Sequence, residues 1–284
     1  MVCVGWVVQR MASTHVVAQF TTAPDAGRWW IQITGGAILY ALATLLLGAT
    51  WYVLLRALGA SGVPASRTLT IYSVSQFGKY LPGSVLQYLG RHAMLRAHDV
   101  SHRLLVLCAL LEAALLVGAA LIWAAPLAVH YVPVNAPMIW VVVAAGLAFA
   151  GWLLHRHAPS LGGGIAISPR WLMLAFALHL AFFGMMGMTF RVVAGAEIVA
   201  TTGWPVLLAG VAASWIAGFV VVGAPAGVGV REAVFLTLFG ALLGEQATLA
   251  CVSAFRLATF GGDLLVFLAA LPFAAAARRA RGAA

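Results

Sequence analysis

The chain has 284 residues, of which 63% are hydrophobic and only 8% are charged. A water-soluble domain carries about 25% charged residues, so the composition excludes a soluble globular domain and predicts a protein embedded in a bilayer. Sixteen Lys and Arg residues against seven Asp and Glu residues give a formal net charge of +9. These cations lie between hydrophobic runs, which is typical of residues that orient membrane helices and not of a nucleic-acid-binding surface.

In chain order, residues 1–32 are predicted to be a truncated first helix or an interfacial segment, followed by an outside loop, because Val2–Val8 is too short to span. Uncharged or nearly uncharged runs follow over Ile33–Leu55, Leu104–Val129, Pro137–Leu154, Trp171–Phe190, Trp204–Val222 and Ala247–Phe273. Each is about long enough to cross a ~30 Å hydrocarbon core as a helix. The period-2 alternation of a membrane barrel is absent. We therefore predict an all-α, polytopic membrane helix bundle of about seven spans over 33–273, with a basic tail over 274–284.

Two segments do not fit as simple spans. Leu69–Leu81 ends at Pro82-Gly83 and continues as a polar-striped helix to about His98, and the Gly-rich run 223–229 precedes a short helix from Val230. Proline removes a backbone donor and glycine permits non-helical dihedrals, so each site should interrupt its helix. The two breaks are half a chain length apart, which indicates an internal pseudo-repeat and a transport site near the midplane. The alternative is that both are ordinary kinks or turns.

The arginines predict the orientation. If the Pro82 segment enters the membrane and returns to the same side, that side carries Arg56, Arg67, Arg91, Arg96, Arg103, Arg156, Arg170, Arg231, Arg278, Arg279 and Arg281. By the positive-inside rule this side is the cytoplasm. We therefore expect a multi-pass protein of the cell inner (plasma) membrane with a cytoplasmic C-terminus.

Ionisable residues inside apolar segments are costly and are candidate functional residues. Glu112 lies near the middle of its run, Arg256 and Asp263 share a helix face two turns apart, and Arg231-Glu232 begin a helix where backbone N–H groups suit an anion. The predicted substrate-binding residues are Lys79, Gln87, Arg91, Glu112, Arg231, Glu232, Arg256 and Asp263, and the predicted backbone breaks are Pro82, Gly83, Pro225, Gly227 and Gly229.

Structural alternatives remain for these residues. Glu112, Arg256 and Asp263 could each be neutralised by a partner on another helix, and Glu232 could satisfy its own helix end. The cations near Pro82 could extend to the membrane surface from an interfacial helix. The spacing of Gly240 and Gly244 predicts a close approach of two helices.

Other patterns predict no metal site, cofactor or enzymatic activity. His98 and His102 lack further ligands at metal-binding spacing, and the distant cysteines form no framework. His179 is alone on an apolar face and is expected to be hydrogen bonded in a helix contact. An intramembrane enzyme would require Glu112, His179 and Asp263 to converge at one depth.

The motifs Ser75–Arg91 and Ala224–Glu232, with a membrane glutamate at Glu112 between them, resemble the transmembrane region of lysylphosphatidylglycerol synthases, which is shared with flippase-like membrane proteins. The resemblance covers residues 33–273 and implies translocation of an anionic, aminoacylated or polyprenyl-linked lipid. Matching residues are Lys79, Pro82, Gly83, Gln87, Arg91, Glu112, Gly227, Gly229, Arg231 and Glu232.

The cytosolic aminoacyl-transfer domain of those synthases is not expected in this chain, and neither is synthase activity. The expected partner is a membrane lipid with an anionic headgroup. The alternative function is a membrane scaffold for a cell-envelope or glycolipid biosynthetic enzyme, in which the face of Gly240 and Gly244 would matter and Arg231 and Glu232 would not.

Overall fold

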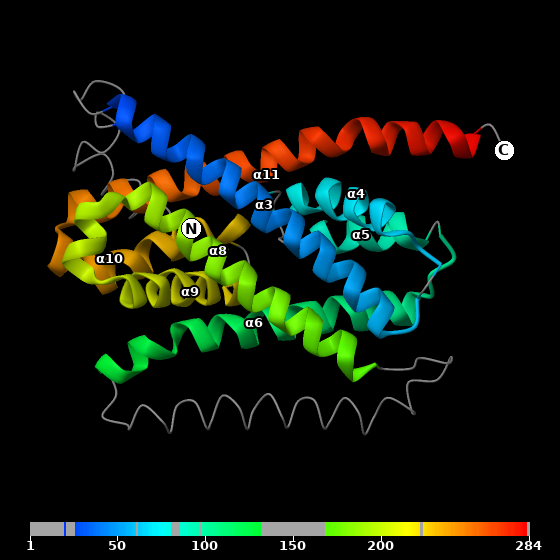
Figure 1. Cartoon of the computed structure of the whole chain (residues 1–284), viewed down its shortest axis with the longest axis horizontal. Helices are drawn as coiled ribbons and strands as arrows, with labels where there is room; N and C mark the ends of the chain where they lie inside the picture. The colour runs from blue at the N-terminus through cyan, green and yellow to red at the C-terminus, as the bar shows by residue number, and fades with distance from the viewer. Residues whose placement is uncertain are drawn as a thin grey trace.

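The computed structural model describes residue 20 and residues 26–60, 62–80, 86–96, 98–131, 168–221 and 224–282. These residues form α-helices and short 3-10 helices without strands, which confirms the predicted all-α bundle. The elements are α3 (Ala26–Ala57), α4 (Ala65–Gln76), η1 (Phe77–Tyr80), α5 (Leu86–Arg96), α6 (His102–Tyr131), α8 (Pro169–Thr202), α9 (Trp204–Val220), η3 (Pro225–Gly227), α10 (Val230–Leu243) and α11 (Glu245–Gly282) (Figure 1).

Four of these helices, α3, α6, α8 and α11, are long and apolar enough to cross a bilayer, so the chain is a membrane protein. They cover four of the predicted spans. α3 begins at Ala26, inside the segment predicted to be an outside loop, because residues 26–32 contain no proline and Trp29, Trp30 and Ile31 extend the apolar run. α11 likewise continues through the predicted tail to Gly282. The predicted span Pro137–Leu154 and most of residues 1–25 lie outside the described residues.

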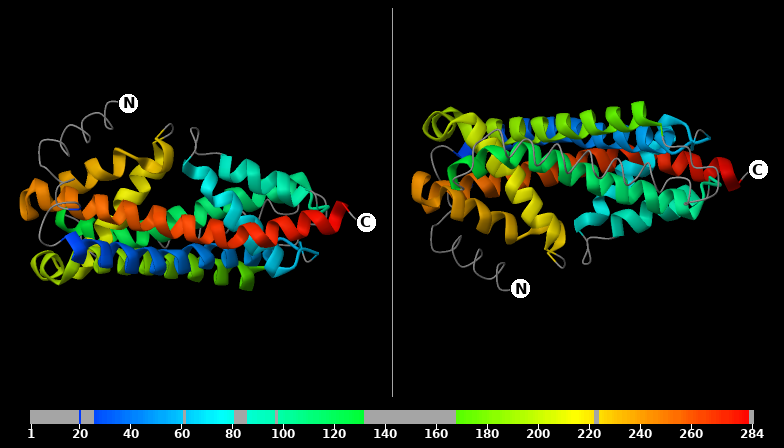
Figure 2. Two further views of the ribbon diagram at one scale, coloured as in Figure 1. Left: turned by 90° about the horizontal axis from the view of Figure 1, so that it is seen from above. Right: turned by 90° about the horizontal axis from the view of Figure 1, so that it is seen from below.

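The remaining helices form two hairpins. α4, η1 and α5 make the first hairpin, and α9, η3 and α10 make the second. α4 has 12 residues and α10 has 14, which at 1.5 Å per residue gives about 18 and 21 Å, short of a ~30 Å core. Figure 2 shows that the hairpins enter the bundle from opposite ends and that their tips face each other near its middle. η1 contacts η3 there.

One predicted span is part of the second hairpin and does not cross the bundle. Trp204–Val222 was expected to cross the membrane, whereas α9 ends at Val220 and the chain turns back into α10. Positive φ angles at Ala226 (49°), Gly227 (71°) and Gly229 (84°) make this reversal. In the first hairpin, the predicted breaks Pro82 and Gly83 lie outside the described residues, and the returning helix ends at Arg96.

The close helix approach predicted at Gly240 and Gly244 is wrong within the described part of the chain. Gly244 ends α10 with φ +83°, and a β-carbon there would meet no neighbouring atom within 4 Å. The close approach lies elsewhere. A β-carbon on Gly262 of α11 would be 2.6 Å from the carbonyl oxygen of Ala37 in α3, so a small residue lets these two helix backbones meet.

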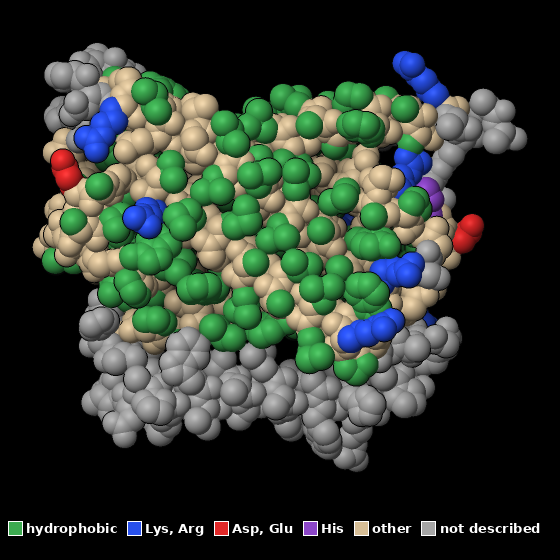
Figure 3. Space-filling model, in the orientation of Figure 1, with side chains coloured by type: hydrophobic (Ala, Val, Ile, Leu, Met, Phe, Trp, Pro, Cys, Tyr) green, Lys and Arg blue, Asp and Glu red, His purple; other side chains and the backbone are tan. Residues whose placement is uncertain are grey.

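The two ends of the bundle differ in charge. The end of α3, the starts of α4, α6 and α8, and the ends of α5 and α11 lie together at one end (Figure 1). These helix termini carry Arg56, Arg67, Arg96, Arg103, Arg170 and Arg279. In Figure 3, Lys and Arg side chains gather at this edge, and the face between the two edges is largely hydrophobic. The lateral surface therefore suits lipid tails, with cations concentrated where headgroups would lie.

Candidate functional site

A cavity of about 250 Å³ lies where the two hairpin tips meet. Six of the eight predicted substrate-binding residues line it: Lys79, Gln87, Arg91, Glu112, Arg231 and Arg256. They come from η1, α5, α6, α10 and α11, so segments separated by up to 177 positions in the sequence (Lys79 to Arg256) converge on one space. The other two residues, Glu232 and Asp263, stand behind the lining and contact its cations.

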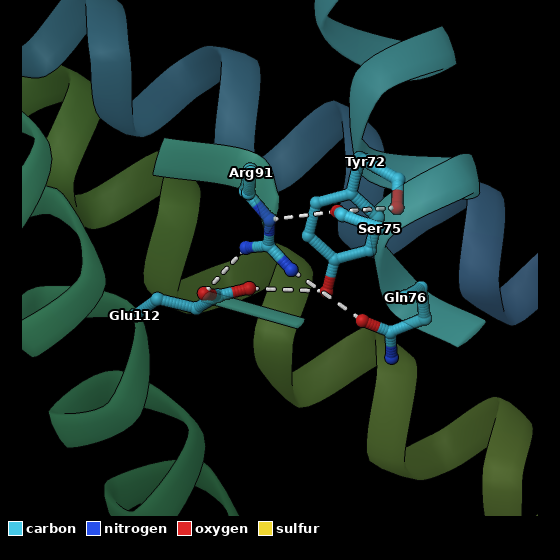
Figure 4. Close-up of polar contacts among 5 residues, drawn as sticks. All are labelled: Tyr72, Ser75, Gln76, Arg91 and Glu112. Atoms are coloured by element: carbon cyan, nitrogen blue, oxygen red, sulfur yellow. Dashed lines mark hydrogen bonds and ion pairs between the residues drawn. The ribbon is translucent and has the colours of Figure 1, made fainter. Parts of the chain in front are cut away.

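Arg91 and Glu112 form a buried ion pair between α5 and α6 (Figure 4). Arg91 Nη1 donates to Glu112 Oε2 at 2.7 Å, and the hydroxyl of Tyr72 donates to Oε1 at 3.0 Å. The guanidinium lies over the ring of Tyr72, 3.9 Å from its centroid, and over that of Trp51 at 4.4 Å. The two charged residues are only 1% and 2% exposed. Glu112 is therefore neutralised by a partner on another helix, one of the alternatives that the sequence left open.

The same guanidinium also binds the first arm of its hairpin. Arg91 Nε donates to Ser75 Oγ and Nη2 donates to Gln76 Oε1, each at 3.4 Å. These contacts join the two arms, α5 and α4, through their side chains. Arg91 is thus the polar centre of the first hairpin, held by groups from α4 and α6.

Lys79 and Asp263 form a second ion pair, between the tip of the first hairpin and α11. The distance from Lys79 Nζ to Asp263 Oδ2 is 2.7 Å. Asp263 Oδ2 also accepts the hydroxyl of Tyr80 at 2.6 Å, and Oδ1 accepts Thr44 Oγ1 from α3 at 3.2 Å. Both carboxylate oxygens are occupied, so Asp263 holds η1 against α11 and α3.

Glu232 has two partners of its own. Its Oε2 accepts the backbone N–H of Gly229 at 2.7 Å, which satisfies the start of α10 as a first-turn acid commonly does. Its Oε1 lies 3.1 Å from Nε of Arg256 in α11. The helix-end alternative for Glu232 therefore holds, and the carboxylate also links the second hairpin to α11.

Arg231 is the fourth cation that lines the cavity. Its Nε is buried without a hydrogen-bond partner, and no carboxylate of the described residues forms an ion pair with it. The side chain passes between two glycines: a β-carbon on Gly218 of α9 would lie 2.7 Å from Nε, and one on Gly227 of η3 would lie 2.8 Å from it. Only backbone without side chains leaves room for the guanidinium at this point.

Aromatic side chains form much of the remaining wall, and the sequence motifs did not point to them. Tyr88, Trp215 and Phe219 line the cavity, with the rings of Trp215 and Phe219 stacked at 4.9 Å. The sequence did contain a pattern that could have identified the polar face of the first hairpin. Four polar residues follow the i, i+3, i+4, i+7 spacing of one helix face: Tyr72, Ser75, Gln76 and Lys79.

His179 stays outside this arrangement. It is buried in α8, and its Nδ1 is 2.8 Å from the carbonyl oxygen of Ala175 one turn earlier in the same helix. Glu112 pairs with Arg91 and Asp263 with Lys79, and no hydrogen bond or ion pair within the described part of the chain joins His179 to either carboxylate. Within the described ranges, no group of three or more His, Cys, Asp or Glu side chains could hold a metal ion.

No family model matches the chain, and no curated protein sequence matches it.

Proposed function

We propose that the protein is a flippase-like lipid translocator of the inner membrane, which moves an anionic headgroup between leaflets. The observation that carries this proposal is the unpaired Arg231 in a cavity shared by two hairpins that enter from opposite ends. A lipid's tails can remain in the bilayer while its headgroup crosses, so such a protein needs a polar cavity at mid-depth rather than a continuous aqueous pore.

The cost of a buried charge favours an anionic cargo. A charged side chain at the bilayer centre costs roughly 2.5–3.5 kcal/mol even on insertion scales. Each of the other cavity cations has a carboxylate partner, whereas Arg231 has none among the described residues. A phosphate-bearing headgroup would supply the missing counter-charge, and arginine offers it two parallel N–H donors.

The orientation proposed from the sequence fits the same function, although Arg91 and Arg231, which the sequence placed among the cations of the cytoplasmic side, line the cavity instead. The end of the bundle that carries six arginines at helix termini would face the cytoplasm, together with the end of α11. The first hairpin would then enter from the cytoplasmic leaflet and the second from the outer leaflet. Each leaflet would have one hairpin that leads to the cavity.

The test is leaflet exchange in liposomes. The purified protein should accelerate the exchange of a fluorescent anionic phospholipid, and Arg231→Gln should reduce the accelerated rate at least tenfold. Arg170→Gln is the matched control, because Arg170 is exposed at a helix start and does not line the cavity. Translocation that is absent for anionic, aminoacylated and polyprenyl lipids alike would refute the proposal and favour the scaffold alternative.

A further inference from the structure

We propose that the cavity selects lipid headgroups with a single negative charge, a phosphodiester, over cationic, zwitterionic and multiply charged headgroups. This inference rests on the proposed function and names the substrate class of the same site. It follows from the charges around the cavity and from the hydrogen bonds that each charged group already makes.

The charges around the cavity do not cancel. Four cations surround the cavity: Lys79, Arg91, Arg231 and Arg256. Three carboxylates neutralise three of them, in the pairs Lys79–Asp263, Arg91–Glu112 and Arg256–Glu232. The described residues at this site therefore leave one positive charge, that of Arg231. A headgroup with one negative charge makes the loaded site neutral, and any other headgroup leaves a buried charge without a counter-charge.

The three carboxylates are already engaged by other groups, and two of them, Asp263 and Glu232, do not line the cavity. Each of their six oxygens already accepts a donor: those of Glu112 from Tyr72 and Arg91, those of Asp263 from Thr44 and from Lys79 with Tyr80. Those of Glu232 accept from Gly229 and Arg256. An ammonium group in the cavity would meet the repulsion of Arg231 and find no free carboxylate oxygen among these three residues. The aromatic wall offers a cation only the weaker attraction of ring faces.

The position of Arg231 supports recognition of one oxyanion rather than several. Gly218 and Gly227 enclose its Nε, which limits the side chain to one path and directs the rest of the guanidinium toward the cavity that it lines. Arg256 lines the same cavity and can contribute further N–H groups to the same oxyanion, but its charge is already matched by Glu232. The second phosphate of a diphosphate headgroup would thus have donors within reach and no net positive charge.

The experiment compares headgroups on identical tails. Proteoliposomes receive fluorescent lipids that share their acyl chains and differ in headgroup: phosphatidylglycerol (one negative charge), phosphatidylcholine (zwitterionic), lysylphosphatidylglycerol (net positive) and phosphatidylinositol phosphate (several negative charges). We expect phosphatidylglycerol to exchange at least tenfold faster than the other three. Equal acceleration of all four would overturn the charge selection and leave translocation intact, and faster exchange of any of the other three would overturn the selection as well.

A variant that adds one positive charge provides the sharper test. Asp263→Asn leaves an amide oxygen that can accept from Tyr80 and an amide N–H that can donate to the hydroxyl oxygen of Thr44, but it frees the charge of Lys79. The cavity then carries two unpaired cations, and the preference should move at least tenfold toward the multiply charged headgroup. Arg231→Gln should abolish the preference for phosphatidylglycerol, and Arg231→Lys should retain part of it. An unchanged order of rates in folded Asp263→Asn protein would contradict the inference.

Binding separates failure of this inference from failure of the proposed function. Short-chain versions of the four lipids are added to the purified protein in detergent, and the thermal unfolding midpoint is measured. Selective stabilisation by the phosphatidylglycerol analogue, lost in Arg231→Gln, supports the charge selection even if no lipid crosses the bilayer. Equal stabilisation by all four analogues, or by none, would overturn the charge selection.

Discussion

The substitution Glu112→Gln tests whether the Arg91–Glu112 pair holds the first hairpin in place. Glutamine keeps an oxygen that can accept from Tyr72 or Arg91 but removes the charge that neutralises a guanidinium only 1% exposed. Removing one partner of a buried ion pair typically costs about 3–5 kcal/mol. The stacking of Arg91 on Tyr72 and Trp51 stays in place, so we expect a loss of about 3 kcal/mol, at the lower end of that range.

The free energy of unfolding can be measured by denaturant titration in mixed micelles. Glu197→Gln is the matched control, since Glu197 is exposed on α8 and a surface change of this kind costs within about 0.5 kcal/mol. Replacing both partners, with Arg91→Met and Glu112→Leu together, should recover much of the loss, because no buried charge then remains. If Glu112→Gln is no more destabilising than Glu197→Gln, the pair does not stabilise the fold and the expected loss is refuted.

The same contacts lead to three more expected outcomes. Gly218→Ala should reduce lipid exchange in liposomes at least tenfold, because the new β-carbon would lie 2.7 Å from Nε of Arg231. Gly184→Ala is the control and should leave the exchange rate unchanged, because its β-carbon would lie at an ordinary contact distance, 3.7 Å, from the ring of Trp123. Lys79→Met should destabilise the protein in the same micelle titration by about 3–5 kcal/mol, because Asp263 loses its counter-charge. Adding Asp263→Asn should restore most of the lost stability. Equal stability of the single and double variants would speak against this pair. If the cavity cations stay fixed while one charge crosses the membrane field, a potassium diffusion potential should change the leaflet ratio of phosphatidylglycerol about tenfold per ~60 mV; a ratio independent of voltage would exclude such charge movement.

The sequence predicted the fold class, and it singled out six residues that line one cavity in the structure, for physical reasons that act locally. Runs of about 20 apolar residues have few alternatives to membrane helices. Charged residues in such runs must find partners, so Glu112, Arg256 and Asp263 stand out in the sequence by their surroundings alone. The Gly-rich stretch before Val230 likewise predicted an interruption, and the positive φ angles at Gly227 and Gly229 are its structural form.

The partners of those charges could not be predicted, because they depend on the rotation of each helix against its neighbours. Arg256 and Asp263 share one helix face, yet each binds a different hairpin. The course of α9 was missed for a related reason. Hydropathy does not distinguish a crossing helix from one arm of a hairpin buried between other helices, and only the 17-residue length of α9 and the turn after it separate the two.

The positions of these pairs on α11 explain how two short hairpins can end inside a membrane. Arg256 binds Glu232 of the second hairpin, and two turns later Asp263 binds Lys79 of the first, so one long helix fixes both tips at neighbouring depths. Backbone groups at a hairpin turn inside a membrane need partners. The two ion pairs fix η1 and α10 on the same helix, at the place where η1 contacts η3. Most of the buried charges therefore serve assembly. A substitution at Arg256 or Asp263 should disturb the position of one hairpin as well as the charge of the cavity, whereas a substitution at Arg231 should alter the cavity alone. Translocation defects in folded protein are thus expected first at Arg231, and loss of folded protein is expected first at the three paired sites.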